Sequence, residues 1–341
     1  MSSRAVFYGL DNRSVGELRG LVNRGWTLIG DPSVKPGGST GLVLDAESAS
    51  KPWLQLGRVV TIAHDKLPAW AGVLDTPWSA KLPVKVTLYN IGYLFQLRTP
   101  DAPLTIKGMT GDIVQAMIER INGQEETYLR VGQVDEDAVR QETLDERPYW
   151  EQLTALIERA GMELQIRPVK EEGRLYLYVD VLYRVGRDTG FLFHDGENHN
   201  MNVVDASIDN EIWNRVVAIG DESTKSGRKR TPPIYEPESI RDYRMRSKNV
   251  QFRDVREMTM LEKYGAIYTQ AASRPILTMK VIIEDVGNAF ENVAVGNTGI
   301  FHAHNLHLPA GRIGWKGIAR MKAIAYDEKT ETVGMTVEAE L

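Results

Sequence analysis

Short runs of β-branched and aromatic residues, separated by Gly, Pro and Asp, recur at both ends of the chain. The early runs cover residues 42–44, 58–62, 70–74 and 84–89, and the late runs cover residues 276–284, 299–302, 317–326 and 331–340. β-branched and aromatic residues favour strands, and the residues between them favour turns. The pattern predicts a small antiparallel barrel or sandwich at each end of the chain.

The apolar period becomes helical in the middle of the chain. One helix is predicted from Gly111 to Ile121, with Thr110 in the N-cap position. A second is predicted from Pro148 to Ala160, because proline suits the first turn and Gly161 suits the end. Residues 162–166 and 175–182 then alternate around a turn at 171–173 and predict a hairpin.

The remaining segments are read from weaker signals. Residues 1–40 are rich in Gly, Arg and turn signals and predict an arm with little core of its own. Residues 212–219 predict a strand, and the polar stretch 222–237 predicts a loop. A third helical segment is expected from Asp254 to Ser273, where Pro275 stops it.

The first and last β regions resemble each other in the order of their elements. Gly57 precedes Trp70 by 13 residues and Gly296 precedes Trp315 by 19, a difference that a longer loop absorbs. Both tryptophans begin a Trp-x-Gly string, and similar strands follow at 84–88 and 333–337. The sequence therefore predicts two related modules in one chain.

These patterns predict an α+β, mostly β fold with two related small antiparallel β-barrels. An α+β domain is inserted between the barrels. The expected order is an N-terminal arm at residues 1–40, a first barrel at 41–105, an α+β middle domain at 106–199, and a second barrel at 200–341.

Composition excludes several classes of function. The 341 residues carry a net charge of −5, so the chain lacks the basic footprint of a nucleic-acid binder. The local patch from Lys225 to Arg230 is read as a solvated loop that could contact an acidic neighbour. There is no cysteine, which excludes disulfides, thiolate nucleophiles and Cys-based metal sites. Neither a secretory signal nor a membrane-spanning apolar stretch is found in the sequence.

Few residues suggest chemistry. Gly37 to Gly41 matches the G-x-S-x-G string, but a β run follows where a nucleophile elbow needs a helix, so a turn is predicted. His302 and His304 point the same way along a strand and, with His307, could hold Zn²⁺ or a similar cation. The alternative is that these histidines are polar surface or interface groups.

Two further clusters contain groups suited to acid/base chemistry or metal binding. His194, Asp195, Glu197 and His199 offer imidazole and carboxylate groups within six residues, although a polar turn is the favoured interpretation. A carboxylate set for glycoside cleavage could be drawn from five residues, but strand alternation does not fix the separation that this chemistry requires. Those residues are Asp205, Asp209, Glu211, Asp221 and Glu222.

The order of motifs resembles the tail-hub or baseplate-hub proteins of phage tails, including the hubs of contractile injection systems. The resemblance rests on Gly57–Ile62 with Trp70–Leu74, on the helix and hairpin of 149–181, on Trp213–Gly220, and on the closing run 296–341. It covers roughly residues 41–341; residues 1–40 have no counterpart, and a bare hub without a fused lysozyme, peptidase or spike is expected. The second barrel is interrupted in this family, so the resemblance implies that it joins residues 200–222 with 276–341 here, and that residues 223–275 are its helical insertion.

The resemblance implies a structural protein of the virion tail tip, made in the host cytoplasm. It implies a homotrimer that binds a hexameric distal tail ring, the tape-measure protein, and a tip fibre or spike protein. It implies no catalytic residue and no cofactor. Two alternatives stay open: a metal- or carboxylate-dependent cell-wall hydrolase of the tail tip, and a spike subunit of a contractile or type VI-like machine.

Overall fold

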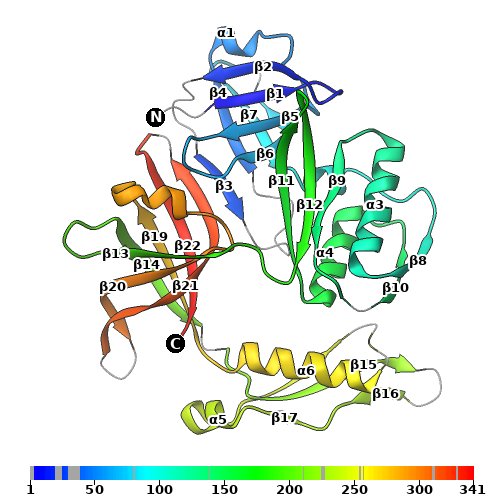
Figure 1. The fold of residues 1–341 in the computed structure, drawn as a ribbon, viewed down its shortest axis with the longest axis vertical. Coiled ribbons are helices and arrows are strands. Elements are labelled where there is room, and N and C mark those ends of the chain that lie inside the picture. The colour runs from blue at the N-terminus through cyan, green and yellow to red at the C-terminus, as the bar shows by residue number, and fades with distance from the viewer. Residues whose placement is uncertain are drawn as a thin grey trace. The chain divides into compact units, whose positions relative to one another are not determined.

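The computed structural model describes residues 4–19, 25–29, 39–79, 81–137, 139–209, 211–223, 227–252, 255, 257–308, 312–327 and 329–341. The chain divides into two compact units. Unit 1 comprises residues 1–204 and 280–337, and unit 2 comprises residues 205–279 and 338–341. Strands form most of unit 1, as the sequence predicted (Figure 1).

A six-stranded sheet, called the first sheet below, contains the early β runs. Its strand order is β2-β1-β5-β6-β7-β4. Every pairing in it is antiparallel. Its strands are β1 (Arg4–Tyr8), β2 (Ser14–Arg19), β4 (Ser39–Leu44), β5 (Val59–Ala63), β6 (Trp70–Trp78) and β7 (Val84–Asn90). The short helices α1 (Ala46–Ala49) and α2 (Tyr93–Gln96) follow β4 and β7.

Residues 1–40, predicted as an arm or loop with little core of its own, contain strands in the described part. Strand β1 pairs with β5, and its Ala5 and Phe7 are fully buried. Strand β3 (Gly25–Ile29) pairs with β21 of another sheet. The Gly- and Arg-rich composition gave no strand pattern here, and the pairings of β1 with β5 and of β3 with β21 join segments far apart in the sequence.

A seven-stranded sheet, called the second sheet, contains the late β runs. Its order is β13-β20-β21-β22-β19-β14, and β3 pairs β21 off this path. Its strands are β13 (Asp188–His194), β14 (Met201–Asp209), β19 (Ile276–Ile283), β20 (Thr298–Leu308), β21 (Arg312–Asp327) and β22 (Thr332–Glu340). A 3-10 segment, η1 (Val286–Asn292), precedes β20. Among the described residues both sheets keep two edge strands.

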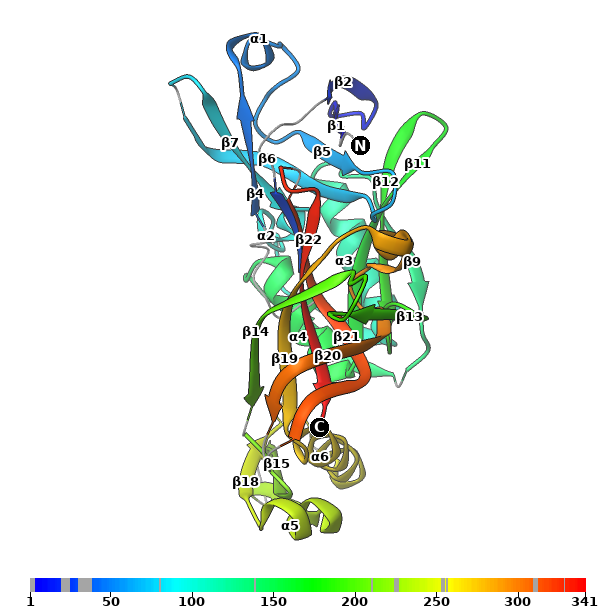
Figure 2. The same cartoon turned by 90° about the vertical axis from the view of Figure 1, so that its left-hand side faces the viewer.

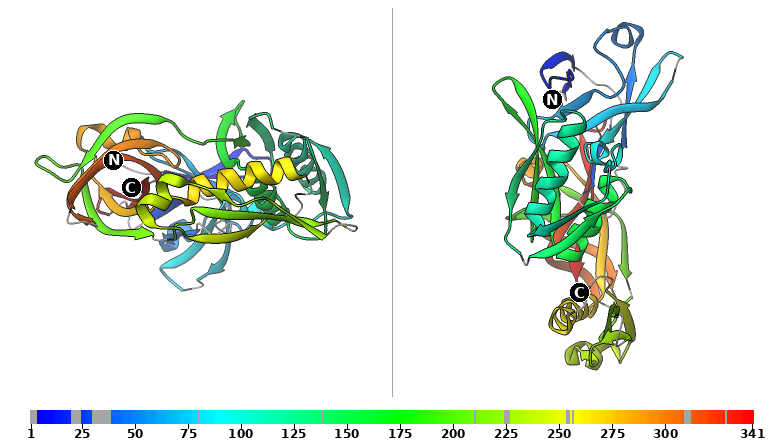
Figure 3. Two further views of the ribbon diagram at one scale, coloured as in Figure 1. Left: turned by 90° about the horizontal axis from the view of Figure 1, so that it is seen from below. Right: turned by 90° about the vertical axis from the view of Figure 1, so that its right-hand side faces the viewer.

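The α+β block, residues 104–182, lies between the two sheets in the sequence. Its elements are β8 (Leu104–Gly108), α3 (Thr110–Gln124), β9 (Leu129–Val134), β10 (Arg140–Leu144), α4 (Tyr149–Ala160), β11 (Glu163–Glu171) and β12 (Arg174–Leu182). Strands β11 and β12 form the predicted hairpin, which turns at Glu172 and Gly173, and β9 pairs in parallel with β12. Helices α3 and α4 cover one face of this sheet (Figure 3, right).

The helix ends follow from named contacts. Thr110 is the first helical residue rather than the N-cap, because its backbone N–H and its hydroxyl both donate to Asp137, at 2.8 and 2.6 Å. Pro148 takes the N-cap position of α4. Gly161 ends α4 in the left-handed conformation at φ 65°, where glycine carries no Cβ penalty.

One apolar core joins the first sheet to the α+β block. Val59, Ala71 and Val73 of the first sheet belong to the same buried cluster as Ile113, Met117, Leu153 and Leu177 of the block. Residues of β5 and β6 that alternate with these three, such as Val60, Ile62 and Trp70, are buried on the opposite face. The first sheet is therefore buried on both faces, which explains the near-continuous apolar character of β5.

Unit 2 has a smaller sheet with helix α6 (Met258–Ala272) packed on it (Figure 3, left). The four strands are β15 (Arg215–Ser223), β16 (Gly227–Arg230), β17 (Ile234–Tyr235) and β18 (Ser247–Gln251), and α5 (Pro237–Tyr243) lies between β17 and β18 in the chain. A Cβ on Gly265 of α6 would lie 2.6 Å from the Cδ1 atom of Ile234, so the glycine permits close packing.

The prediction of a loop at 222–237 is wrong. Strands β16 and β17 both pair antiparallel with β15 in this stretch. Gly227–Arg230 carries three consecutive cationic side chains and has no apolar alternation, so its backbone pairing has no signature in the side chains. Strands at sheet edges are commonly charged, because charge prevents edge-to-edge aggregation.

Candidate functional site

The two sheets begin their central hairpins with the same local structure. Gly57 and Gly296 both adopt positive φ, at 80° and 89°. The N–H of Gly57 donates to the carbonyl of Leu74 at 2.7 Å, and the N–H of Leu74 donates back to Arg58 at 2.8 Å. In the second sheet, the N–H of Gly296 donates to Met321 at 2.8 Å, and Met321 donates back to Asn297 at 2.9 Å. The glycine match predicted from the sequence is thus a structural match.

The pairing register continues unchanged from these glycines. In the first sheet Val59 faces Val73, and the next pairs follow to Ile62 and Trp70. In the second sheet Thr298 faces Arg320, and the next pairs follow to Phe301 and Gly317. Each residue of β5 therefore has an equivalent in β20, and each residue of β6 has one in β21.

This register corrects the sequence alignment of the tryptophans. Trp70 is equivalent to Gly317 and not to Trp315, which faces Ala303 two residues further along. The local Trp-x-Gly structure is nevertheless the same in both hairpins. A Cβ on Gly72 would lie 2.2 Å from the Trp70 ring, and one on Gly317 would lie 2.6 Å from the Trp315 ring. In both strings the indole covers the glycine two residues later.

The flanking strands extend the correspondence. The hairpin and the strand after it form the order β5-β6-β7 in the first sheet and β20-β21-β22 in the second. The strand that precedes each hairpin in the sequence, β4 or β19, pairs with the third strand of this set. The first strand of each hairpin has another neighbour on its other side. In the first sheet this neighbour is β1, antiparallel to β5, and in the second sheet it is β13, parallel to β20. The two sheets thus share the order of four strands, β5-β6-β7-β4 in the first sheet and β20-β21-β22-β19 in the second.

The structure brings together two histidine clusters that are more than 100 residues apart. Strand β13 runs beside β20, so that His194 faces His302. The rings of His302 and His304 lie 3.8 Å apart between centroids. The Nδ1 atom of His304 lies 2.6 Å from Oδ1 of Asp195, and the backbone N–H of His304 donates to the same oxygen at 2.9 Å. The contact between Asp195 and His304 could not be predicted from the sequence, because it depends on the parallel pairing of β13 with β20.

The charges of this cluster follow from its contacts. Burial alone would raise the pKa of Asp195, but the backbone and side-chain hydrogen bonds from His304 outweigh burial and hold it below its ordinary value. Partial desolvation, followed by the nearby His304 and Lys316, lowers the pKa of His302. The contacts therefore favour the carboxylate form of Asp195 and the neutral form of His302, relative to the same groups in water.

The other candidate residues lie apart from this cluster or outside the described residues. His307 lies beyond an irregularity in β20 and faces Ile313, and the zinc hypothesis stays a prediction. In the described part of the chain, no group of three or more His, Asp or Glu side chains is arranged to hold a metal ion. Glu197 and His199 are exposed, as are Asp205, Asp209 and Glu211.

Some predictions fall partly on residues that are not described. Gly37, Gly38 and Lys225 lie outside the described residues, and so do the side chains of Asp221 and Glu222. Ser39 to Gly41 begin strand β4, and Arg228 to Arg230 form strand β16. Across the described residues, none of the helices combines the length and apolar character needed to cross a membrane.

Comparison of structures identifies proteins with the same fold. The prophage tail protein gp18 of Listeria monocytogenes aligns with a TM-score of 0.64 and 12% identity, over 99% of this chain and 94% of that chain. The 43 kDa tail protein of prophage MuSo2 from Shewanella oneidensis aligns with a TM-score of 0.65 and 11% identity, over 99% and 98% of the two chains. The Escherichia coli c3393 protein, a type VI secretion component, aligns with a TM-score of 0.50 and 9% identity, over 98% and 72%.

Comparisons of sequence gave no match. No family model matches the chain. No curated protein matches it either. The chain has the fold of phage tail proteins, and at the level of the fold the predicted resemblance to tail hubs is confirmed.

Proposed function

We propose that this chain is a non-enzymatic structural hub of a phage-type tail tip. The proposal is supported most directly by the shared register of the two hairpins, which starts from Gly57 in one sheet and Gly296 in the other. The likeness to prophage tail proteins over nearly the whole chain adds to it. Two equivalent sheets in one chain are what a subunit needs if it contributes two similar segments to a ring.

In the proposed assembly, three chains form a ring with six similar sheets. Each sheet closes into a small barrel within that ring, and the three-fold ring thereby presents six similar edges to a hexameric distal tail ring. The tape-measure protein and a tip fibre or spike protein are the other proposed neighbours. The proposed location is the virion tail tip.

The mass of the purified chain in solution tests this proposal. Light scattering of the purified chain is expected to give three times the 38.3 kDa of one chain, and a larger mass once the distal ring protein is added and bound. A trimer depends on protomer concentration, so the mass should fall on dilution. A chain that stays monomeric at every concentration and never joins a ring would contradict the proposal.

A further inference from the structure

Helix α6 covers one face of the four-stranded sheet of unit 2. A Cβ on Gly265 of α6 would lie 3.0 Å from the Cβ atom of Ala218, and one on Gly220 would lie 3.4 Å from Leu261 of α6. Val216, Ala218 and Gly220 of β15 therefore point towards the helix, and all three are buried. Figure 2 shows α6 on one side of β15 and β18.

The residues that alternate with these three define the opposite face of the sheet, called the open face below. On β15 they are Arg215, Val217 and Ile219, which are half-buried. The pairing register places exposed residues of the other strands beside them on the same face. These residues are Tyr235 of β17, Ser247, Asn249 and Gln251 of β18, and Arg230 of β16. The described chain thus leaves the open face uncovered.

The sequence of β15 is nevertheless typical of a strand that is covered on both faces. Residues 216–219 form an unbroken apolar run, and β15 pairs in parallel with β18. Strands in parallel pairing are normally buried on both faces and have continuous apolar runs, whereas a strand with one face in water alternates. Val217 and Ile219 depart from that alternation, and a further layer on the open face would bury them.

A helix is the layer that fits this face. Sheets with parallel strands are covered by helices on both faces, because each face must bury its apolar side chains against another element. Helix α6 provides this cover on one face only. Since the described chain leaves the other face exposed, we expect the second helix to come from another molecule.

The charge of the sheet selects an acidic helix. The four strands carry five Lys and Arg against two Asp and Glu, although the whole chain has a net charge of −5. On the open face, Arg215 lies 5.8 Å from the centre of the Tyr235 ring, and Arg230 is exposed. Carboxylates beside an aliphatic stripe would complement this surface. The five cations are Arg215, Arg228, Lys229, Arg230 and Lys248, and the two acidic residues are Asp221 and Glu222, whose side chains lie outside the described part.

A nucleic acid fits the open face less well than a protein helix. Proteins that bind single strands stack the bases on aromatic side chains along a cationic groove. The centre of the open face consists of the aliphatic Val217 and Ile219, and Tyr235 lies at the end of β17 beside Arg215. Aliphatic side chains suit the apolar stripe of a helix.

We propose that the open face of unit 2 binds an acidic amphipathic helix of another protein. Its aliphatic stripe packs on Val217 and Ile219, and its carboxylates lie near Arg215 and Arg230. In the proposed hub this helix belongs to a neighbouring tail protein, and in that respect the inference rests on the proposed function. The open face itself consists of residues of a single chain, so that binding does not require the trimer.

Fluorescence anisotropy with the full chain tests this surface. The probe is a labelled helical peptide of about 18 residues, or roughly five turns, with leucine along one face and glutamate on both flanks. The comparison probes are the same peptide with lysine in place of glutamate, and a single-stranded DNA oligonucleotide of equal negative charge. The acidic peptide is expected to bind at least about tenfold more tightly than either. Tighter binding of the oligonucleotide would overturn the proposal in favour of a nucleic acid.

Substitutions show whether the peptide binds at the open face. Arg230→Glu is expected to weaken its binding by about tenfold or more, because a carboxylate then faces the glutamates of the peptide. Lys263→Glu is the matched control, since it makes the same charge change at an exposed position of α6, on the other side of the sheet. Equal losses in the two variants would mean that total charge attracts the peptide, and would overturn the proposal.

A third variant tests the aliphatic contact. Ile219→Ala is expected to weaken binding of the acidic peptide by about threefold to tenfold, because fewer apolar atoms are buried against its leucines. Circular dichroism of each variant checks that the fold is retained. Unchanged affinity in a folded Ile219→Ala chain would contradict a helix packed on this face.

Light scattering of the same samples separates this surface from the proposed function. A trimeric chain that fails to bind the acidic peptide would overturn the open face as a helix site and leave the proposed hub intact. Peptide binding by a chain that stays monomeric would support the site and contradict the hub. If Arg230→Glu changed the mass of the assembly and left the peptide affinity unchanged, the open face would be a contact between copies and the proposal would be overturned.

Discussion

Single residues set the shape of the hairpins, and Gly57 and Gly296 do so for different reasons. A Cβ on Gly57 would meet no atom within 4 Å, so only its positive φ requires glycine. A Cβ on Gly296 would lie 2.5 Å from the carbonyl oxygen of Val185, so the space is also closed. The two positions share a backbone conformation and differ in how much a substitution would disturb.

Alanine substitution should reveal this difference. Gly57→Ala is expected to lower the free energy of unfolding by about 1–2 kcal/mol, the cost of a left-handed L-residue. Gly296→Ala is expected to cost more, because backbone must also move away from the new methyl group. Gly123→Ala is the control, since it lies in α3 with open space around it and should stabilise by about 0.5–1 kcal/mol. Urea denaturation measures all three, and equal losses at Gly57 and Gly296 would contradict the argument.

His64 links the first sheet to the second. It is buried, its ring lies 4.8 Å from Tyr326 and 6.1 Å from Phe290, and its Nδ1 atom accepts from the N–H of Lys66 at 3.2 Å. Burial lowers its pKa and outweighs the carboxylates nearby, which act in the opposite direction. The carboxylates that raise it are Asp65, Asp285 and Glu331.

Acid should therefore weaken this contact. When the folded pKa of a histidine is below its unfolded value, the unfolded state binds more protons, and stability falls as pH decreases from about 6.5 towards the lowered pKa. His64→Phe keeps an aromatic ring beside Tyr326 and cannot be protonated. The melting temperature of this variant is expected to fall less between pH 7.5 and pH 5.5 than that of the wild type. If the melting temperatures of the variant and the wild type fell equally over this pH range, protonation of His64 would not be what weakens the fold in acid.

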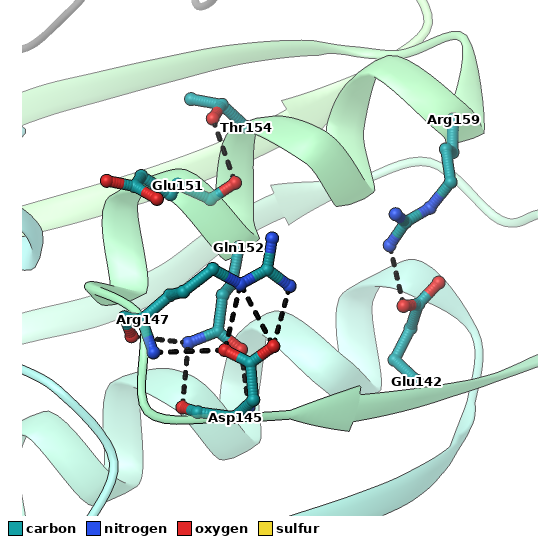
Figure 4. Close-up of polar contacts among 7 residues, drawn as sticks. All are labelled: Glu142, Asp145, Arg147, Glu151, Gln152, Thr154 and Arg159. Atoms are coloured by element: carbon teal, nitrogen blue, oxygen red, sulfur yellow. Dashed lines mark hydrogen bonds and ion pairs between the residues drawn. The ribbon is translucent and has the colours of Figure 1, made fainter. Parts of the chain in front are cut away.

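At the scale of elements, the start of helix α4 is held by a buried polar side chain, which bonds to the backbone of the preceding turn. Gln152 is buried and donates to the carbonyl of Arg147 at 2.6 Å, and its Oε1 accepts from the N–H of Asp145 at 2.8 Å (Figure 4). At the other end of the helix, Arg159 pairs with Glu142 of β10 at 2.6 Å. These contacts fix the turn that leads from β10 into the helix.

Removal of the Gln152 amide should destabilise the α+β block. Gln152→Ala removes the hydrogen-bond partner of partly buried backbone groups of Asp145 and Arg147, and the loss of these bonds costs about 1 kcal/mol. Glu151→Ala, one residue earlier on the exposed side of α4, should change stability by less than about 0.5 kcal/mol. Chemical denaturation of the two variants is the measurement. If Glu151→Ala lowered the free energy of unfolding as much as Gln152→Ala, the loss would come from helix propensity and not from the hydrogen bonds to the turn.

At the scale of the whole molecule, the chain has two units with separate cores. Leu261 of α6 is fully buried in unit 2, and Leu177 of β12 is fully buried in unit 1. Unit 2 is much smaller and therefore buries a smaller fraction of its surface on folding. We expect two transitions in calorimetry, with unit 2 unfolding at the lower temperature.

Leucine-to-alanine variants assign these transitions. Each substitution leaves a cavity that costs about 2–5 kcal/mol. Leu261→Ala should lower only the first transition, and Leu177→Ala should lower only the second. One transition that shifts equally in both variants would mean that the two units unfold as one.

The sequence by itself determined the elements whose signals are local. The periods of α3 and α4, the C-terminal Gly161, the β11–β12 hairpin and the Gly57 and Gly296 turns depend on neighbouring residues, and each is present in the structure. The tertiary structure alone decided what pairs over long distances. It placed β1 beside β5, His194 beside His302, and Asp195 against His304. It also decided that Ala71 is buried and Ile318 exposed, because burial depends on which surface lies opposite a side chain and not on its own hydrophobicity.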